Sequence, residues 1–177
     1  RVSLDKVGGE YQGVIFDFIN RLQTGCIRHV FGKDGTLWVG QTGRGWGSAG
    51  GKEYGLQQVK WDGKTTPFSM HDVKLTKKGF RITFTKPVDK ALANDLKNYS
   101  IERWGYHYHP KYGSPKTDLK RDNPTKVSVS KDGLEAQIEV TLEKSRVYKL
   151  NLGAIAAKDG SKMANSFAWY TLNQLKD

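Results

Sequence analysis

Alternation of apolar and polar residues with a period of two is the feature that most constrains the fold of this chain. Two runs carry apolar side chains at every second position: Phe80, Ile82 and Phe84 in the first, and Ala136, Ile138, Val140 and Leu142 in the second. Because successive side chains of a strand point to opposite faces, both runs predict half-buried antiparallel strands. The chain also has 20 glycines, several of them after Asp in turn-forming pairs that separate such runs. We therefore predict an all-β fold.

Residues 1–66 are expected to form one unit. Asp34-Gly35 lies between two apolar-aromatic segments, where such a pair supplies the positive φ angles of a tight hairpin. A glycine-rich loop and a third strand at residues 56–61 follow, and residues 1–18 are expected to form another strand pair. One four-stranded antiparallel sheet and part of a neighbour would account for these strands. Such a sheet exposes its faces and edges, so it does not close a core alone.

Residues 67–177 are expected to form a second unit, an immunoglobulin-like or fibronectin-like β-sandwich. About seven short strands, separated by turn signals such as Asp132-Gly133, occur in roughly a hundred residues, which is typical of that architecture. One short helical segment is expected after Asp89, whose side chain suits an N-cap. A polar linker around Pro67 marks the boundary between the two units.

Charge and cysteine content narrow the classes of function. The net charge is +11, but the basic residues are scattered and no nucleic-acid-binding sequence pattern accompanies them. We therefore expect a solvated basic surface and no nucleic-acid partner. No segment is apolar enough to cross a bilayer as a helix. The single cysteine, Cys26, precedes an apolar strand and is expected to be a small buried hydrophobe. We do not expect it to be a nucleophile, because His29 would point to the other face of the strand.

Five motifs together carry a resemblance to a known family. They are RGWGS at 44–48, YGLQ at 54–57, FTKPVD at 84–89, YGSP at 112–115 and YTLN at 170–173. With the segments around them, they resemble the C-terminal part of exported propeller proteins related to glucose and sorbosone dehydrogenases, which are quinoprotein-like. The resemblance covers nearly the whole chain. It implies that residues 1–66 are the final blade of a β-propeller and that the sandwich of residues 67–177 follows it.

The resemblance also implies a role and a location. The chain would be a non-catalytic C-terminal scaffold of a larger sugar or alcohol dehydrogenase, in the periplasm or outside the cell. A chain that begins inside a strand, as this one does at Arg1, fits a piece of a longer protein. Its partners would be the rest of the propeller, other subunits, or a c-type cytochrome domain. In an alternative, the chain is an accessory subunit of a membrane-associated complex, in which its basic surface meets an acidic partner.

In the family, pyrroloquinoline quinone (PQQ), calcium and the catalytic base belong to earlier blades. No residue of this chain matches those positions, and no Cys-x-x-Cys-His site for haem is present. We therefore expect no cofactor in this chain, while PQQ, calcium or haem belong to the parent protein.

The glycine-rich loop supplies the first group of candidate contact residues, which are Arg44, Trp46 and Tyr54. The loop lies between strands and lacks the Gly-Lys-Ser/Thr ending of a phosphate loop. Its side chains would contact a ligand or the sandwich at the top of the propeller. Alternatively, Trp46 fills a gap between blades.

An aromatic cluster supplies the second group, which comprises Trp104, Tyr106, His107, Tyr108, His109 and Tyr112. Flat aromatic faces stack on sugar rings, so the chain could be a carbohydrate-binding module. His107 and His109 would share one face of a strand, but a metal site needs a third ligand that the sequence does not identify. The remaining alternative is packing of the cluster against the propeller or a neighbouring subunit.

Overall fold

The computed structural model describes residues 1–43 and 50–177, and it divides the chain into two compact units. The first combines Arg1–Asp17 with Thr66–Asp177, and the second is Phe18–Thr65. All the sheets are antiparallel and none closes on itself, so the prediction of an all-β fold is confirmed.

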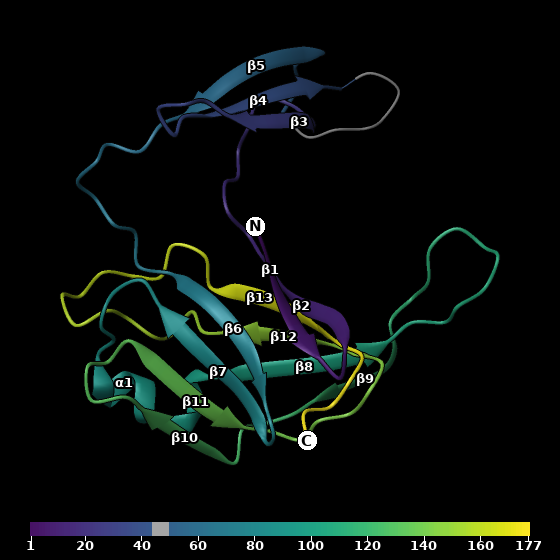
Figure 1. The fold of residues 1–177 in the computed structure, drawn as a ribbon, viewed down its shortest axis with the longest axis vertical. Helices are drawn as coiled ribbons and strands as arrows, with labels where there is room; N and C mark the ends of the chain where they lie inside the picture. The colour runs from purple at the N-terminus through teal and green to yellow at the C-terminus, as the bar shows by residue number, and fades with distance from the viewer. Residues whose placement is uncertain (44–49) are drawn as a thin grey trace. The chain divides into compact units, whose positions relative to one another are not determined.

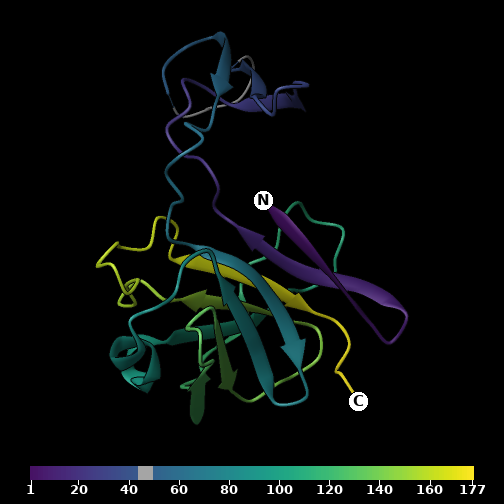
Figure 2. The same cartoon turned by 60° about the vertical axis from the view of Figure 1, so that its left-hand side comes forward.

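The first unit is a sandwich of two sheets (Figure 1, Figure 2). One sheet has six strands, in the spatial order β1 (Val2–Val7), β2 (Glu10–Phe16), β13 (Phe167–Leu172), β12 (Arg146–Asn151), β8 (Ser100–Gly105) and β9 (Thr117–Arg121). The other has four, in the order β10 (Lys126–Val129), β11 (Glu135–Glu139), β7 (Gly79–Phe84) and β6 (Met70–Thr76). One continuous core cluster lies between them.

Phe80 shows how the two sheets meet. It is fully buried on β7, and its ring lies 5.3 Å from that of Tyr148 on β12 and 5.1 Å from that of Tyr170 on β13. The side chains that alternate with it, Ile82 and Phe84, are buried as well, and so are Ala136, Ile138 and Val140. The predicted alternation of inward and outward positions is therefore confirmed for both runs.

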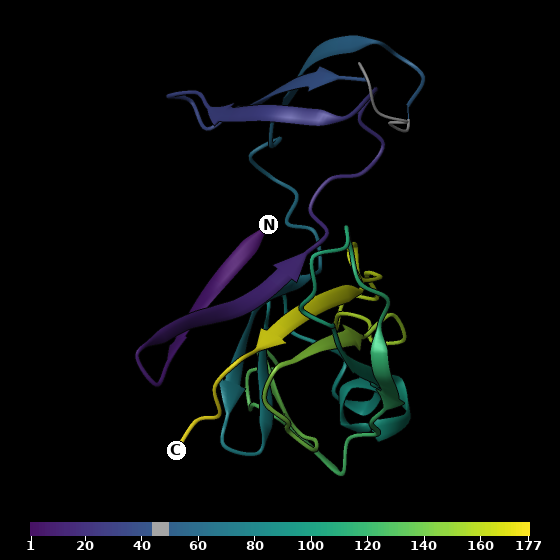
Figure 3. The same cartoon turned by 90° about the vertical axis from the view of Figure 1, so that its right-hand side faces the viewer.

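The first seventeen residues lie in the sandwich, whereas the sequence placed them with residues 18–66. β2 pairs with β13 from Phe16 opposite Ala168 to Gly13 opposite Thr171 (Figure 3). Val14 and Phe16 are buried in the sandwich core. The pairing gives β13 a second neighbour besides β12 and removes apolar surface of β2 from water.

The predicted helical turn also forms. α1 (Lys90–Asn94) begins at Asp89, whose carboxylate accepts hydrogen bonds from the backbone N–H groups of Ala91 and Leu92. A 3-10 turn, η1 (Leu96–Asn98), follows and is capped in the same way by Asp95. Both caps satisfy backbone donors that have no partner inside the helix.

The second unit is a three-stranded sheet, β3 (Cys26–Phe31), β4 (Leu37–Thr42) and β5 (Tyr54–Val59). The Asp34-Gly35 turn joins the first two strands, with Gly35 at a φ of +79° and Asp34 accepting a hydrogen bond from the Thr36 N–H. The sequence predicted a sheet of four strands and part of a neighbour. The unit has three because the strand pair expected from residues 1–18 lies in the sandwich.

Candidate functional site

A long loop between β8 and β9 projects from the sandwich (Figure 1). We call residues 106–116 the aromatic loop. The side chains of Tyr108 and Tyr112 are fully exposed, at 107% and 102% of their reference area, and Tyr106 is 54% exposed. Three of the tyrosine rings predicted to form a contact surface are therefore open to solvent.

Short-range hydrogen bonds shape this loop. The Ser114 hydroxyl accepts a hydrogen bond from the backbone N–H of His107 (2.9 Å) and donates one to the carbonyl of Pro115 (3.0 Å). The ring Nδ1 of His109 accepts from the backbone N–H of Lys111 at 3.2 Å. These contacts join turn residues near the tyrosines and do not involve the tyrosine rings.

Trp104 forms the base of the loop and is not part of its surface. Its side chain is 2% exposed, the ring of Tyr106 meets it edge-on at 6.5 Å, and the Lys116 ammonium lies 3.8 Å from its ring centre. The two ends of the loop, Tyr106 and Lys116, are thus both held against one buried ring. An ammonium over an indole face is attracted by the ring quadrupole, whose face is electron-rich.

The expectation that His107 and His109 share one face of a strand is wrong. β8 ends at Gly105, which is the last residue of that strand to pair with β9. The Arg146 guanidinium lies where a side chain at Gly105 would stand, and the backbone then leaves the sheet. Among the described residues, no three His, Cys, Asp or Glu side chains are grouped as a metal site.

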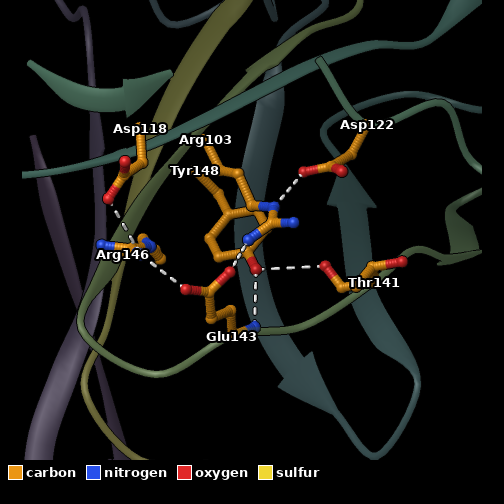
Figure 4. Close-up of polar contacts among 7 residues, drawn as sticks. All are labelled: Arg103, Asp118, Asp122, Thr141, Glu143, Arg146 and Tyr148. Atoms are coloured by element: carbon orange, nitrogen blue, oxygen red, sulfur yellow. Dashed lines mark hydrogen bonds and ion pairs between the residues drawn. The ribbon is translucent and has the colours of Figure 1, made fainter. Parts of the chain in front are cut away.

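A cluster of charged side chains fixes the strands on which the loop stands (Figure 4). Arg103 on β8 is 6% exposed and forms ion pairs with Asp122, just after β9, and with Glu143. Arg146 on β12 pairs with Glu143 at 2.6 Å and with Asp118 on β9 at 3.5 Å. β9 is therefore attached near both of its ends by charge-assisted contacts, which are stronger than neutral ones.

Tyr148 completes this cluster from the sandwich core. Its hydroxyl accepts a hydrogen bond from the Glu143 N–H (2.8 Å) and donates one to the Thr141 carbonyl (3.0 Å). Burial raises the pKa of Tyr148 to about 12, so the hydroxyl stays protonated and can donate. Sequence reasoning missed the cluster, because its members lie on separate segments and no local pattern joins them.

The three-stranded sheet presents a second exposed surface, which we call the open face. Residues opposite one another in neighbouring strands share a face, and the register places Val30 opposite Trp38, Gly40 opposite Leu56, and Thr42 opposite Tyr54. The apolar members are 63% (Val30), 38% (Trp38), 67% (Leu56) and 77% (Tyr54) exposed. Of the predicted glycine-loop contacts, Tyr54 lies on this face, while Arg44 and Trp46 lie outside the described residues.

Part of the other face of this sheet is covered by the segment before β3, through polar contacts with β4 and β5. Phe31 of β3, which lies opposite Leu37 on that face, is 66% exposed. The backbone N–H groups of Gln23 and Thr24 donate to the side-chain oxygens of Gln57 and Gln41. The Gln41 amide donates in turn to Gln57 at 2.8 Å. Glutamine side chains, not apolar ones, therefore fill much of the space where a core would be.

The remaining candidates are explained by local structure. Cys26 is exposed, so the expectation of a buried cysteine is wrong; the thin core of this unit leaves β3 open to water. The carboxylates of Asp34, Asp62, Asp132 and Asp159 accept hydrogen bonds from backbone N–H groups of their own turns. For Asp159, bonds from Ser161 and then Lys86 lower the pKa to about 2. These aspartates shape turns.

No protein-family model matches the chain, and no curated protein matches it. Solved structures of the surface-layer protein SbsC are similar to part of it. Domains 1–6 of SbsC show 27% identity over 62% of this chain at a TM-score of 0.47, and the N-terminal part shows 27% identity over 60% at 0.44. The chain spans 14% and 24% of the lengths of those proteins. TM-scores this low carry no argument about fold or function.

Proposed function

We propose that this chain is a non-catalytic scaffold and interaction region of a larger protein, in which the open face packs against another β-sheet of that protein. One observation carries the proposal. Val39 is the only fully buried hydrophobic residue among the described residues of 18–65, and no residue of this unit belongs to the core cluster. A unit of this size that buries so little has too small a core for stability of its own.

The open face carries apolar side chains whose burial would add the stability that the unit lacks. Transferring one aliphatic or aromatic side chain from water to an apolar interface stabilises a fold by about 1.5–3 kcal/mol. Val30 lies opposite Trp38, and Leu56 lies opposite Gly40 on the same face, so all three are available for such burial. Burying all three side chains would therefore stabilise the unit by about three times the free energy gained from burying one.

A sheet is the partner that suits this surface. The middle strand carries Gly40 between Arg28 and Leu56, so the centre of the face has no protruding side chain. Sheets pack face to face through interdigitating side chains, as propeller blades do. The three strands then correspond to part of a propeller blade, and the rest of the blade and its neighbour come from the larger protein.

The identity proposed for the parent protein follows from the resemblance to glucose and sorbosone dehydrogenases. The parent would be an exported quinoprotein-like sugar or alcohol dehydrogenase, periplasmic or extracellular. The sandwich would be its immunoglobulin-like domain, with β1 and β2 before the three-stranded unit and the other strands after it. The five sequence motifs are the support for this part. PQQ, calcium or haem would be held by the parent's other segments. Within the described residues no helix is long and apolar enough to span a membrane.

A matched pair of double variants tests the open face. Val30→Thr with Leu56→Thr removes two exposed aliphatic side chains and keeps a residue that strands favour. We expect the isolated wild-type chain to self-associate and to bind a hydrophobic dye through this face. The double variant should weaken self-association about tenfold or more, since two apolar contacts are lost.

Val2→Thr with Leu4→Thr is the control, because those two side chains are 63% and 60% exposed on β1 of the sandwich. Sedimentation velocity and dye fluorescence are the measurements. A control pair that weakens self-association as much as the open-face pair would contradict the proposal. So would a wild-type chain that stays monomeric and binds no dye.

A further inference from the structure

We propose that the aromatic loop binds an anionic polysaccharide, a glycan chain whose sugar rings carry carboxylates. This site belongs to the sandwich and is independent of the open face and of the proposed scaffold role. The site combines exposed tyrosine rings with two lysines, on a loop whose return strand, β9, is held by ion pairs of Arg103 and Arg146.

The tyrosines provide the stacking surface. Tyr108 and Tyr112 are fully exposed and Tyr106 is half-exposed, although aromatic side chains are normally drawn into cores. A tyrosine ring offers a flat apolar face to the C–H groups of a sugar ring and a hydroxyl to its polar rim. It also has few rotatable bonds, so little conformational entropy is lost when it binds. Several such rings on one loop give a glycan more than one stacking contact.

The positive charge of the loop favours an anionic glycan over a neutral one. From Trp104 to Thr117 the sequence contains no Asp or Glu, while Lys111 and Lys116 lie among the aromatic residues. The nearest carboxylates on the return strand are occupied: Asp118 pairs with Arg146, and Asp122 pairs with Arg103. The loop therefore presents an uncompensated positive charge, on a chain whose net charge is +11.

Single-stranded nucleic acid is the other polymer that combines stacking with negative charge. Proteins hold it in a basic groove that follows the phosphate backbone. Here the rings and lysines belong to residues 106–116, a loop that projects from the sandwich between two strands (Figure 1). An acidic polysaccharide needs only ring faces with a cation beside them. The geometry therefore favours the glycan.

Titration calorimetry with hexagalacturonate tests the proposal. We expect binding to the 177-residue chain that weakens as salt is added, and no binding of the neutral cellohexaose. Tyr108→Ala with Tyr112→Ala should lower the affinity for hexagalacturonate about tenfold or more, because two stacking contacts are lost. Both side chains are fully exposed, so the melting temperature of this variant should match that of the wild type.

Two controls separate stacking in the loop from general effects. Tyr11→Ala removes a tyrosine that is 66% exposed and has Lys6 over its ring, but lies on β2; it should leave the affinity unchanged. Lys111→Ala should weaken binding and flatten its salt dependence. Absence of hexagalacturonate binding, equal binding of cellohexaose, or unchanged affinity in the tyrosine pair would overturn the proposal. Tighter binding of oligo-deoxythymidylate would assign the loop to nucleic acid instead.

Discussion

Replacing Arg103 with alanine is expected to lower the free energy of unfolding of the sandwich by about 3–5 kcal/mol, the usual cost of removing one partner from a buried ion pair. Arg103 is 6% exposed and forms an ion pair with Asp122 in the charged cluster (Figure 4). Glu143 keeps a second partner, Arg146, after the change. Asp122, whose side chain is 15% exposed, would lose its ion-pair partner, and the cost of leaving it unpaired dominates the loss.

Arg121→Ala is the matched control on the neighbouring strand. Its guanidinium is 70% exposed and lies 3.7 Å from Glu102, so we expect a change within about 1 kcal/mol. Denaturant unfolding followed by tryptophan fluorescence gives both values. Equal effects of the two substitutions would mean that the charged cluster does not hold β9 to the sandwich.

Replacing Asp5 with alanine is expected to cost about 2–4 kcal/mol, because two buried donors lose a charged acceptor at once. The Asp5 carboxylate accepts hydrogen bonds from the Leu75 N–H of β6 and from the Tyr170 hydroxyl of β13, both at 2.9 Å. Burial, and then the bond to Asp5, raise the pKa of Tyr170, so this hydroxyl remains a donor at neutral pH. Asp5 thus joins β1 to both sheets.

The Asp5 variant tests whether residues 1–17 belong to the sandwich. Glu10→Ala, at an exposed position of the same hairpin, is the control and should change the free energy of unfolding by less than about 0.5 kcal/mol. Chemical denaturation of both variants is the measurement. If Asp5→Ala unfolds like Glu10→Ala, β1 and β2 do not contribute to the stability of the sandwich.

Local patterns in the sequence predicted the local structure of this chain. The alternation at Phe80, Ile82 and Phe84 identified both the strand and its buried face, since a period of two has a single structural meaning. The hairpin at Asp34-Gly35 and the cap at Asp89 were also predictable, because each needs only the residues beside it. These features depend on chemistry within a few residues.

Contacts between distant segments were not predictable in the same way. Nothing in residues 1–17 shows that β2 pairs with β13, which follows about 150 residues later. The aromatic cluster was identified as a group, but only the structure separates the buried Trp104 from the exposed Tyr108 and Tyr112. The side chains are similar in type, and the end of β8 at Gly105 decides which of them reach solvent.

The most direct test of the scaffold proposal is amide hydrogen exchange on the isolated 177-residue chain. We predict slow exchange in β7, β12 and β13, which enclose the core, and exchange faster by orders of magnitude in β3, β4 and β5, whose unit buries only Val39 fully among its described hydrophobic residues. Protection of β3–β5 equal to that of β12 would contradict the proposal, because the unit would then be stable without a partner sheet.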